Sequence, residues 1–179
     1  MSTLKVGTIQ DHANSNNALL IDSSGRITAP ANPKFSVRLG TTTGNTDYTT
    51  PASIPTYDVP LDTEDFDIGG CMSITGSVAT FTSPITGYYQ FNLTVTFQSA
   101  GNSTHVNTFF DVNGTLTSDL ADNHYRVITD PEGGGYHTLA QSALINVPAG
   151  QTVKPKLYVA NDTTVAIRRG SRFQGFLVP

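Results

Sequence analysis

The residue types that most often do chemistry in proteins are few in this chain, and their spacing fits none of the common metal-binding patterns. Four histidines are present, and no pair of them has the H-x-x-x-H or H-E-x-x-H spacing of a zinc site. Three lie in or beside expected loops, where a histidine is usually a surface residue. We therefore expect no histidine chemistry from His12, His105, His124 or His137.

Carboxylates gather in two stretches of the sequence. Asp62, Asp65 and Asp67 are the candidate metal ligands, although with Glu64 they lack the register and the distal Glu of an EF-hand. A solvated turn is the simpler interpretation of this cluster. The second stretch consists of Asp119, Asp122, Asp130 and Glu132. A glycoside hydrolase needs two carboxyl groups at a fixed separation, which an Asp-rich loop does not indicate.

The remaining candidates also favour structural interpretations. No G-x-S-x-G nucleophile elbow occurs, and the glycines at 133–135 lack the Lys-Ser/Thr of a phosphate loop. Cys71 is interpreted as a buried, inert thiol. One basic cluster is present, formed by Arg168, Arg169 and Arg172. It could bind an anionic glycan, but the simpler interpretation is a hairpin rim that pairs with Asp162 or with a neighbouring subunit. We therefore expect a protein that is not an enzyme and that binds no cofactor.

Composition excludes further classes of function. Charged residues make up 13% of the 179 residues, and the net charge of −4 provides no basic surface for nucleic acid. No apolar run approaches the roughly 20 residues that a membrane-spanning helix needs. The opening residues lack the apolar core of a secretory signal, so none is expected. We expect neither nucleic-acid binding nor membrane insertion.

Composition and periodicity together predict an all-β chain. The sequence has 26 Thr, 12 Asn, 12 Asp and 16 Gly against 2 Glu and 4 Lys, a balance that favours strands and turns over helices. Apolar residues alternate with polar ones from Tyr89 to Phe97, and shorter runs repeat this pattern up to Leu177. Asn113-Gly114 is a strong hairpin signal. About ten short antiparallel strands predict a sandwich or jelly roll over residues 35–179.

Several segments of this region resemble the C1q/TNF-like globular domain. Residues 79–91 contain the Phe-Thr pair, the Pro and the Gly-x-Tyr-x-Phe of that family, and residues 172–179 resemble its closing Phe-x-Gly-Phe-Leu. Residues 35–39, 66–70, 141–144 and 148–153 resemble other pieces in the same order.

The resemblance implies a jelly roll of about ten strands that assembles as a homotrimer. It implies that Gly175 allows a close backbone approach near the middle of that assembly. It also keeps calcium at Asp62, Asp65 and Asp67 open, because some members bind this ion. The long loops at 41–58 and 117–137 depart from the family and would be variable contact surfaces. The residues implied in the fold and the trimer core are Phe81, Gly87, Tyr89, Phe91, Phe173, Gly175, Phe176 and Leu177.

Residues 1–34 form a different, mostly polar segment. They contain too few large apolar residues to bury a core alone, so we expect an extended anchor or shaft that orders against other chains. Residues 19–27 predict two short strands around a Ser-Gly turn. Residues 1–10 resemble the amino-terminal pieces of tailed-bacteriophage virion proteins. That resemblance implies a virion anchor through Leu4, Val6 and Ile9.

These expectations combine into one hypothesis with two alternatives. The chain would be a trimeric fibre or spike protein of a phage virion, assembled in the cytoplasm of the bacterial host. Residues 1–34 would bind other virion proteins, and the head would bind a glycan or protein of the host surface. The alternatives are a decoration protein that stabilises the phage capsid and, less favoured by the sequence, a glycan-degrading virion enzyme.

Overall fold

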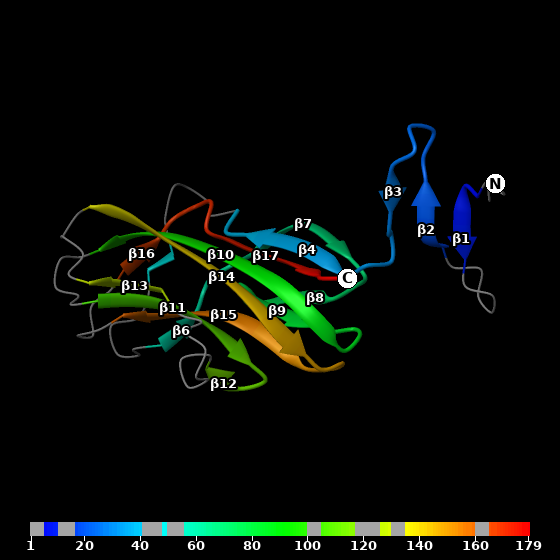
Figure 1. Cartoon of the computed structure of the whole chain (residues 1–179). Coiled ribbons are helices and arrows are strands. Elements are labelled where there is room, and N and C mark those ends of the chain that lie inside the picture. Colours follow the sequence, from blue (N-terminus) through cyan, green and yellow to red (C-terminus); the bar gives the residue numbers. More distant parts are fainter. Residues whose placement is uncertain are drawn as a thin grey trace.

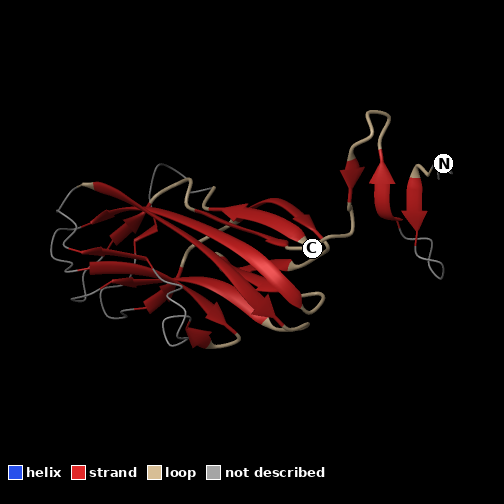
Figure 2. Ribbon diagram, in the orientation of Figure 1, coloured by secondary structure: helices blue, strands red, loops and turns tan. Residues whose placement is uncertain are grey.

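The computed structural model describes residues 6–10, 17–40, 48–49, 56–99, 105–116, 126–129, 135–159 and 165–179. Within these ranges every regular element is a strand, and all strand pairs are antiparallel (Figure 2). None of these residues belongs to a helix long and apolar enough to cross a membrane. The all-β prediction is confirmed. The described residues of the head form fourteen strands, β4 to β17, more than the ten expected, because several very short strands flank the long ones.

One layer of the head, the β10 sheet, is built around a central strand. β10 (Gly87–Ser99) pairs with β14 (Tyr136–Val147) on one side. On its other side it pairs first with β17 (Arg172–Leu177) and then with β16 (Val165–Ile167). β4 (Lys34–Arg38) and β7 (Thr63–Ile68) continue the sheet beyond β17, and β5 (Tyr48–Thr49) continues it beyond β16.

The second layer, the β11 sheet, faces the first (Figure 1). Its main order is β12 (Thr115–Leu116), β11 (His105–Val112), β15 (Thr152–Val159), β9 (Val78–Thr82) and β8 (Met72–Thr75). β13 (Arg126–Thr129) also pairs with β11, and β6 (Thr56–Asp58) also pairs with β15. The two sheets form the sandwich that the alternating pattern predicts.

Aromatic rings from both sheets fill the space between the layers. Tyr89 and Phe91 of β10 are fully buried, as the alternation predicts, and the other odd residues up to Phe97 are buried with them. The Phe35 ring centroid lies 5.3 Å from that of Phe81 and 4.9 Å from that of Phe173. These rings come from four different strands. Their contacts therefore fix how the two sheets lie against each other.

Gly175 of β17 sits inside this aromatic cluster. A Cβ atom at this position would lie 2.6 Å from the Phe35 ring and 2.8 Å from the Phe91 ring. The close approach expected near the middle of an assembly is therefore an approach between the backbone of one subunit and its own core. Glycine is needed here because the two rings occupy the place of a side chain.

Two tight hairpins use residues with positive φ. Asn113 and Gly114 have φ of 50° and 87°, which confirms the turn predicted between β11 and β12. Gly76 and Ser77 have φ of 56° and 66° between β8 and β9, a second hairpin of the same kind that the sequence analysis did not identify. Ser77 takes a conformation that is uncommon outside glycine and asparagine.

Residues before the head form a small sheet of their own. β1 (Thr8–Gln10), β2 (Asn17–Ile21) and β3 (Ile27–Thr28) pair in that order. The turn between β2 and β3 confirms the predicted Ser-Gly hairpin. The described strands of this segment thus form a three-stranded antiparallel sheet. Figure 1 shows it apart from the head, beyond the end at which the C-terminus lies.

Substitution of Gly175 tests the packing of the aromatic cluster. We expect Gly175→Ala to lower the free energy of unfolding by about 1–3 kcal/mol, the usual cost of overpacking a filled core. Urea unfolding followed by circular dichroism measures it. Gly7→Ala is the control, since a Cβ there would meet nothing within 4 Å. Equal unfolding midpoints for the two variants would contradict this account of the core.

Candidate functional site

The even-numbered residues of β10 point away from the core onto the outer surface of the β10 sheet. Gln90 lies directly opposite Leu144 of β14 on one side and Phe176 of β17 on the other. Phe176 lies opposite Lys34 of β4, which lies opposite Ile68 of β7. Directly opposite residues in antiparallel strands share a face, so these five side chains form one row across five strands.

Large apolar side chains concentrate on this surface, which we call the outward face. Among the described residues, eleven large apolar side chains are exposed, and six of them lie on the outward face. The strand registers place all six there, although they come from four strands that are distant in the sequence. They are Phe66, Ile68, Tyr88, Tyr136, Leu144 and Phe176. An exposed apolar set of this kind is a candidate contact surface for another macromolecule.

A hollow of about 250 Å³ opens on the outward face. Its walls combine two exposed aromatic rings, an ammonium group and two carboxamides. They are formed by Lys34, Phe35, Phe66, Asn92, Gln174, Gly175 and Phe176. Rings with a few hydrogen-bonding groups can receive a protruding side chain or a small amphipathic ligand.

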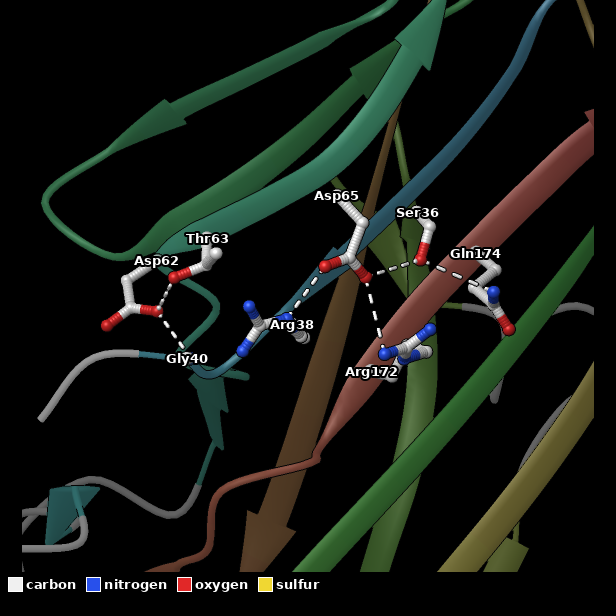
Figure 3. A network of polar contacts seen from close by, with 8 residues as sticks. All are labelled: Ser36, Arg38, Gly40, Asp62, Thr63, Asp65, Arg172 and Gln174. Atoms are coloured by element: carbon white, nitrogen blue, oxygen red, sulfur yellow. Dashed lines mark hydrogen bonds and ion pairs between the residues drawn. The ribbon is translucent and has the colours of Figure 1, made fainter. Parts of the chain in front are cut away.

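Asp65 is the hub of a polar network beside the hollow (Figure 3). Its Oδ1 accepts a hydrogen bond from Arg38 Nε at 2.7 Å, and Arg172 Nη2 lies 3.3 Å from its Oδ2. Ser36 Oγ donates to Oδ2 at 3.1 Å and accepts from Gln174 Nε2 at 3.3 Å. The Arg38 hydrogen bond is the main reason that the pKa of Asp65 lies below its ordinary value of 3.8.

A β-bulge brings Asp65 onto the outward face. Ser36 lies opposite Phe66, but the next residue, Val37, lies opposite Glu64, so Asp65 is the extra residue of β7. Without this irregularity, Asp65 and Phe66 would point to opposite faces of the sheet. The bulge lets both of them occupy the outward face.

The other candidate metal ligands have separate structural roles. Asp62 Oδ1 accepts from the Gly40 amide at 2.7 Å. Asp67 accepts from the amides of Cys71 and Met72, each at 3.0 Å, and so closes the turn between β7 and β8. The described residues contain no group of three His, Cys, Asp or Glu side chains placed to hold an ion. The interpretation of 62–67 as a solvated turn was wrong, because residues from Thr63 onward form strand β7.

Cys71 is the buried thiol that the sequence predicted. Its side chain is 2% exposed, and burial together with the Asp67 hydrogen bond raises its pKa to about 12. A thiol with so high a pKa stays protonated at neutral pH and is a poor nucleophile.

The arginine cluster divides between two places. Arg172 pairs with Asp65, whereas the pairing expected with Asp162 falls outside the described residues. Arg168 Nη2 donates to Gln98, and its guanidinium lies 4.8 Å from the centroid of the Tyr136 ring. Both arginines therefore contribute to the outward face rather than to an isolated rim.

β14 presents a long free edge next to this face. Its side away from β10 pairs with no other strand in the described part of the chain. Its 12 residues include no Asp, Glu, Lys, Arg or Pro, the residues with which proteins usually protect an edge. An edge of this kind needs a cover to avoid uncontrolled pairing.

Most of the residues expected in the fold and the trimer core lie in the core of the head. Phe81, Tyr89, Phe91 and Phe173 are buried between the sheets, and only Phe176 of that set lies on the outward face. A Cβ at Gly87 would lie 2.7 Å from Leu177 Cδ1, so these two residues pack against each other. The other members of the outward face were not predicted from the sequence. The signal for them in the sequence is that they alternate with the buried residues of the same strands.

Several predicted residues fall elsewhere. Val6 precedes β1 and Ile9 lies within it, and both are exposed. His105 begins β11, and the His137 ring stacks on Phe97 with centroids 5.5 Å apart. The others lie outside the described residues: Leu4, His12, Asp119, Asp122, His124, Asp130 and Glu132.

No protein-family model and no curated protein matches this chain. Among solved structures, mouse APRIL at pH 8.5 aligns with a TM-score of 0.54 at 12% identity, and mouse APRIL at pH 5.0 with 0.55 at 10%. Each alignment covers 83% of this chain and 99% of the other. The globular domain of zebrafish complement 1qA aligns with a TM-score of 0.50 at 16% identity, covering 83% and 98%. The head therefore has the expected C1q/TNF-like jelly-roll fold.

Removal of the Asp65 charge tests the polar network. A carboxyl whose pKa is lower in the folded than in the unfolded chain stabilises the fold above its unfolded pKa, and this contribution is lost as pH falls through the folded pKa. We expect Asp65→Asn to lower the free energy of unfolding at pH 7 by up to about 1 kcal/mol, because the ion pairs are partly exposed. The gap between variant and parent should close as pH falls below 3.8.

Urea unfolding at pH 7 and at acidic pH measures this difference. The matched control is Glu64→Gln, which removes the same charge one residue away, at a side chain that has no ion pair among the described residues. The interpretation fails if Glu64→Gln destabilises the head as much as Asp65→Asn does.

Proposed function

We propose that this chain is a non-enzymatic, homotrimeric attachment protein in which the outward face is the contact between subunits. The C1q/TNF-like fold itself suggests a non-enzymatic, typically trimeric domain. The observation that carries the proposal is the position of six exposed apolar side chains on one face of the β10 sheet, five of them within two residues of the row through Gln90. Removing one such side chain from water stabilises an interface by about 1.5–3 kcal/mol.

The free edge of β14 supports the same arrangement. Thr138, Ala140 and Ser142 give the middle of β14 small side chains on its outward side, between the larger Tyr136 and Leu144. A neighbouring subunit can approach this middle stretch closely, because little side-chain volume must be displaced. Closed threefold symmetry would cover each free edge without offering a further edge for uncontrolled growth.

We propose further that the trimer is a fibre or spike component of a tailed-phage virion. The resemblance of residues 1–10 to phage virion proteins supports this role, as does the division of the chain into a small sheet and a head. Residues 1–34 would join the trimer to other virion proteins. The head would present three copies of its loops to a glycan or protein of the host surface, so that weak single contacts add up through multivalency.

Light scattering tests the trimer and its face. We expect the parent protein to have three times the 19.1 kDa of one chain. Leu144→Asp and Phe176→Asp should give single chains, because a buried unpaired charge opposes the contact. The control is Ile85→Asp, which places the same charge at an exposed apolar residue in the turn between β9 and β10. Circular dichroism checks that each variant is folded. A parent mass of one chain in dilute buffer would refute the trimer.

Imaging of native particles tests the virion role. Labelled copies of the chain should lie on tail fibres, and a chain that lacks residues 1–34 should not join particles. Label at capsid lattice points would assign the chain to capsid decoration instead. Incorporation of the shortened chain would show that the anchor lies elsewhere.

A further inference from the structure

The small sheet before the head has one apolar face. Ile9 of β1 lies opposite Leu19 of β2, and Ile21 of β2 lies opposite Ile27 of β3. Leu19 and Ile21 are two residues apart on one strand, so these four side chains share a face. We call it the shaft face. The opposite face of the same pairs carries Thr8, Leu20 and Thr28.

Among the described residues, none buries the shaft face, although Leu19 and Ile21 are half-buried. None of residues 6–10 and 18–32 is buried, and Ile9 and Ile27 are 47% and 66% exposed. No charged side chain lies among its four members, and the neighbouring charges pair within the hairpin turn, where Arg26 Nε lies 2.6 Å from Asp22 Oδ2. A unit of about 30 residues buries too little apolar surface to be stable alone, and units of this size usually need oligomerisation, a metal or a disulfide. Its partner must therefore be apolar and uncharged at the contact.

The attachment of this sheet to the head identifies that partner. Residues 29–33 join β3 to β4 and reach at most about 20 Å. Pro33 is buried, and its carbonyl accepts from the Leu177 amide at 3.0 Å, which fixes the end of the connector on the head. β4 then continues into the sheet that bears the outward face. In a trimer joined through that face, each small sheet meets two others at an effective concentration on the order of millimolar.

We propose that the shaft faces of three copies pack against one another around the threefold axis and form a three-sided β-shaft. This inference rests on the proposed trimer. The shaft face complements itself, because an aliphatic, uncharged surface buries an identical one without an unpaired charge. Thr8 and Thr28 then face solvent on the outside of the shaft. Surfaces of the virion would contact the outside or the tip of this unit and not the shaft face.

Cysteine cross-linking in the full-length protein tests the shaft. The native Cys71 is 2% exposed and will not compete in the reaction. Ile27→Cys places a thiol on the shaft face, and Thr28→Cys places the matched thiol one residue away on the opposite face. Under mild oxidation we expect about tenfold more disulfide-linked dimer on a denaturing gel for Ile27→Cys, because a disulfide needs Cα atoms within about 7 Å. Equal yields, or no dimer from either variant, would overturn the shaft.

Light scattering of the reduced variants separates this proposal from the trimer itself. A trimeric mass without preferential cross-linking at residue 27 rejects the shaft and leaves the head trimer intact. A single-chain mass rejects the proposed trimer. If a variant with a single-chain mass still cross-links preferentially at residue 27, the shaft faces associate without the head trimer. If it has a single-chain mass and does not cross-link preferentially, both proposals are rejected.

Discussion

The structure depends on the packing of aromatic rings from both sheets around the bare backbone of Gly175. Phe35, Phe91 and Phe173 belong to three adjacent strands of the β10 sheet, and Phe81 meets them from the β11 sheet. Because side chains alternate along a strand, these buried rings determine which residues face outward. A register shift of one residue would place the rings in water and the outward face in the core. The core and the outward face are therefore two results of one register.

The outward face combines exposed apolar side chains with a network of charged and polar side chains. Phe66, Leu144 and Phe176 supply apolar area, which attracts any apolar partner. The Asp65 network lies beside them and holds two guanidinium groups and a carboxylate in fixed positions. A partner that packs on the apolar residues must also match this arrangement of charges. Charge of this kind contributes to orientation and partner choice more than to affinity.

The sequence was sufficient for the fold and insufficient for the site. The alternation from Tyr89 to Phe97 predicted the buried residues of β10. Asn113-Gly114 predicted the hairpin between β11 and β12. Both signals are local in the sequence. Phe66 and Phe176 share a surface only through the pairing of β7, β4 and β17, which no local pattern reveals. The sequence pattern around Asp65 predicted a turn. The real orientation of Asp65 depends on a β-bulge opposite Ser36, 29 residues earlier in the chain, which a local pattern does not reveal.

The position of β17 has a consequence for biosynthesis. This strand lies between β10 and β4 in the middle of its sheet, yet every other strand of the head precedes it in the chain. A nascent chain can form hairpins such as β8–β9 while it leaves the ribosome, but β4 has no neighbour on its inner side until Phe173 and Gly175 have been translated. Premature termination before this point leaves an open sheet with exposed rings, which chaperones and proteases can recognise. Completion of the β10 sheet thus requires that translation has passed β17.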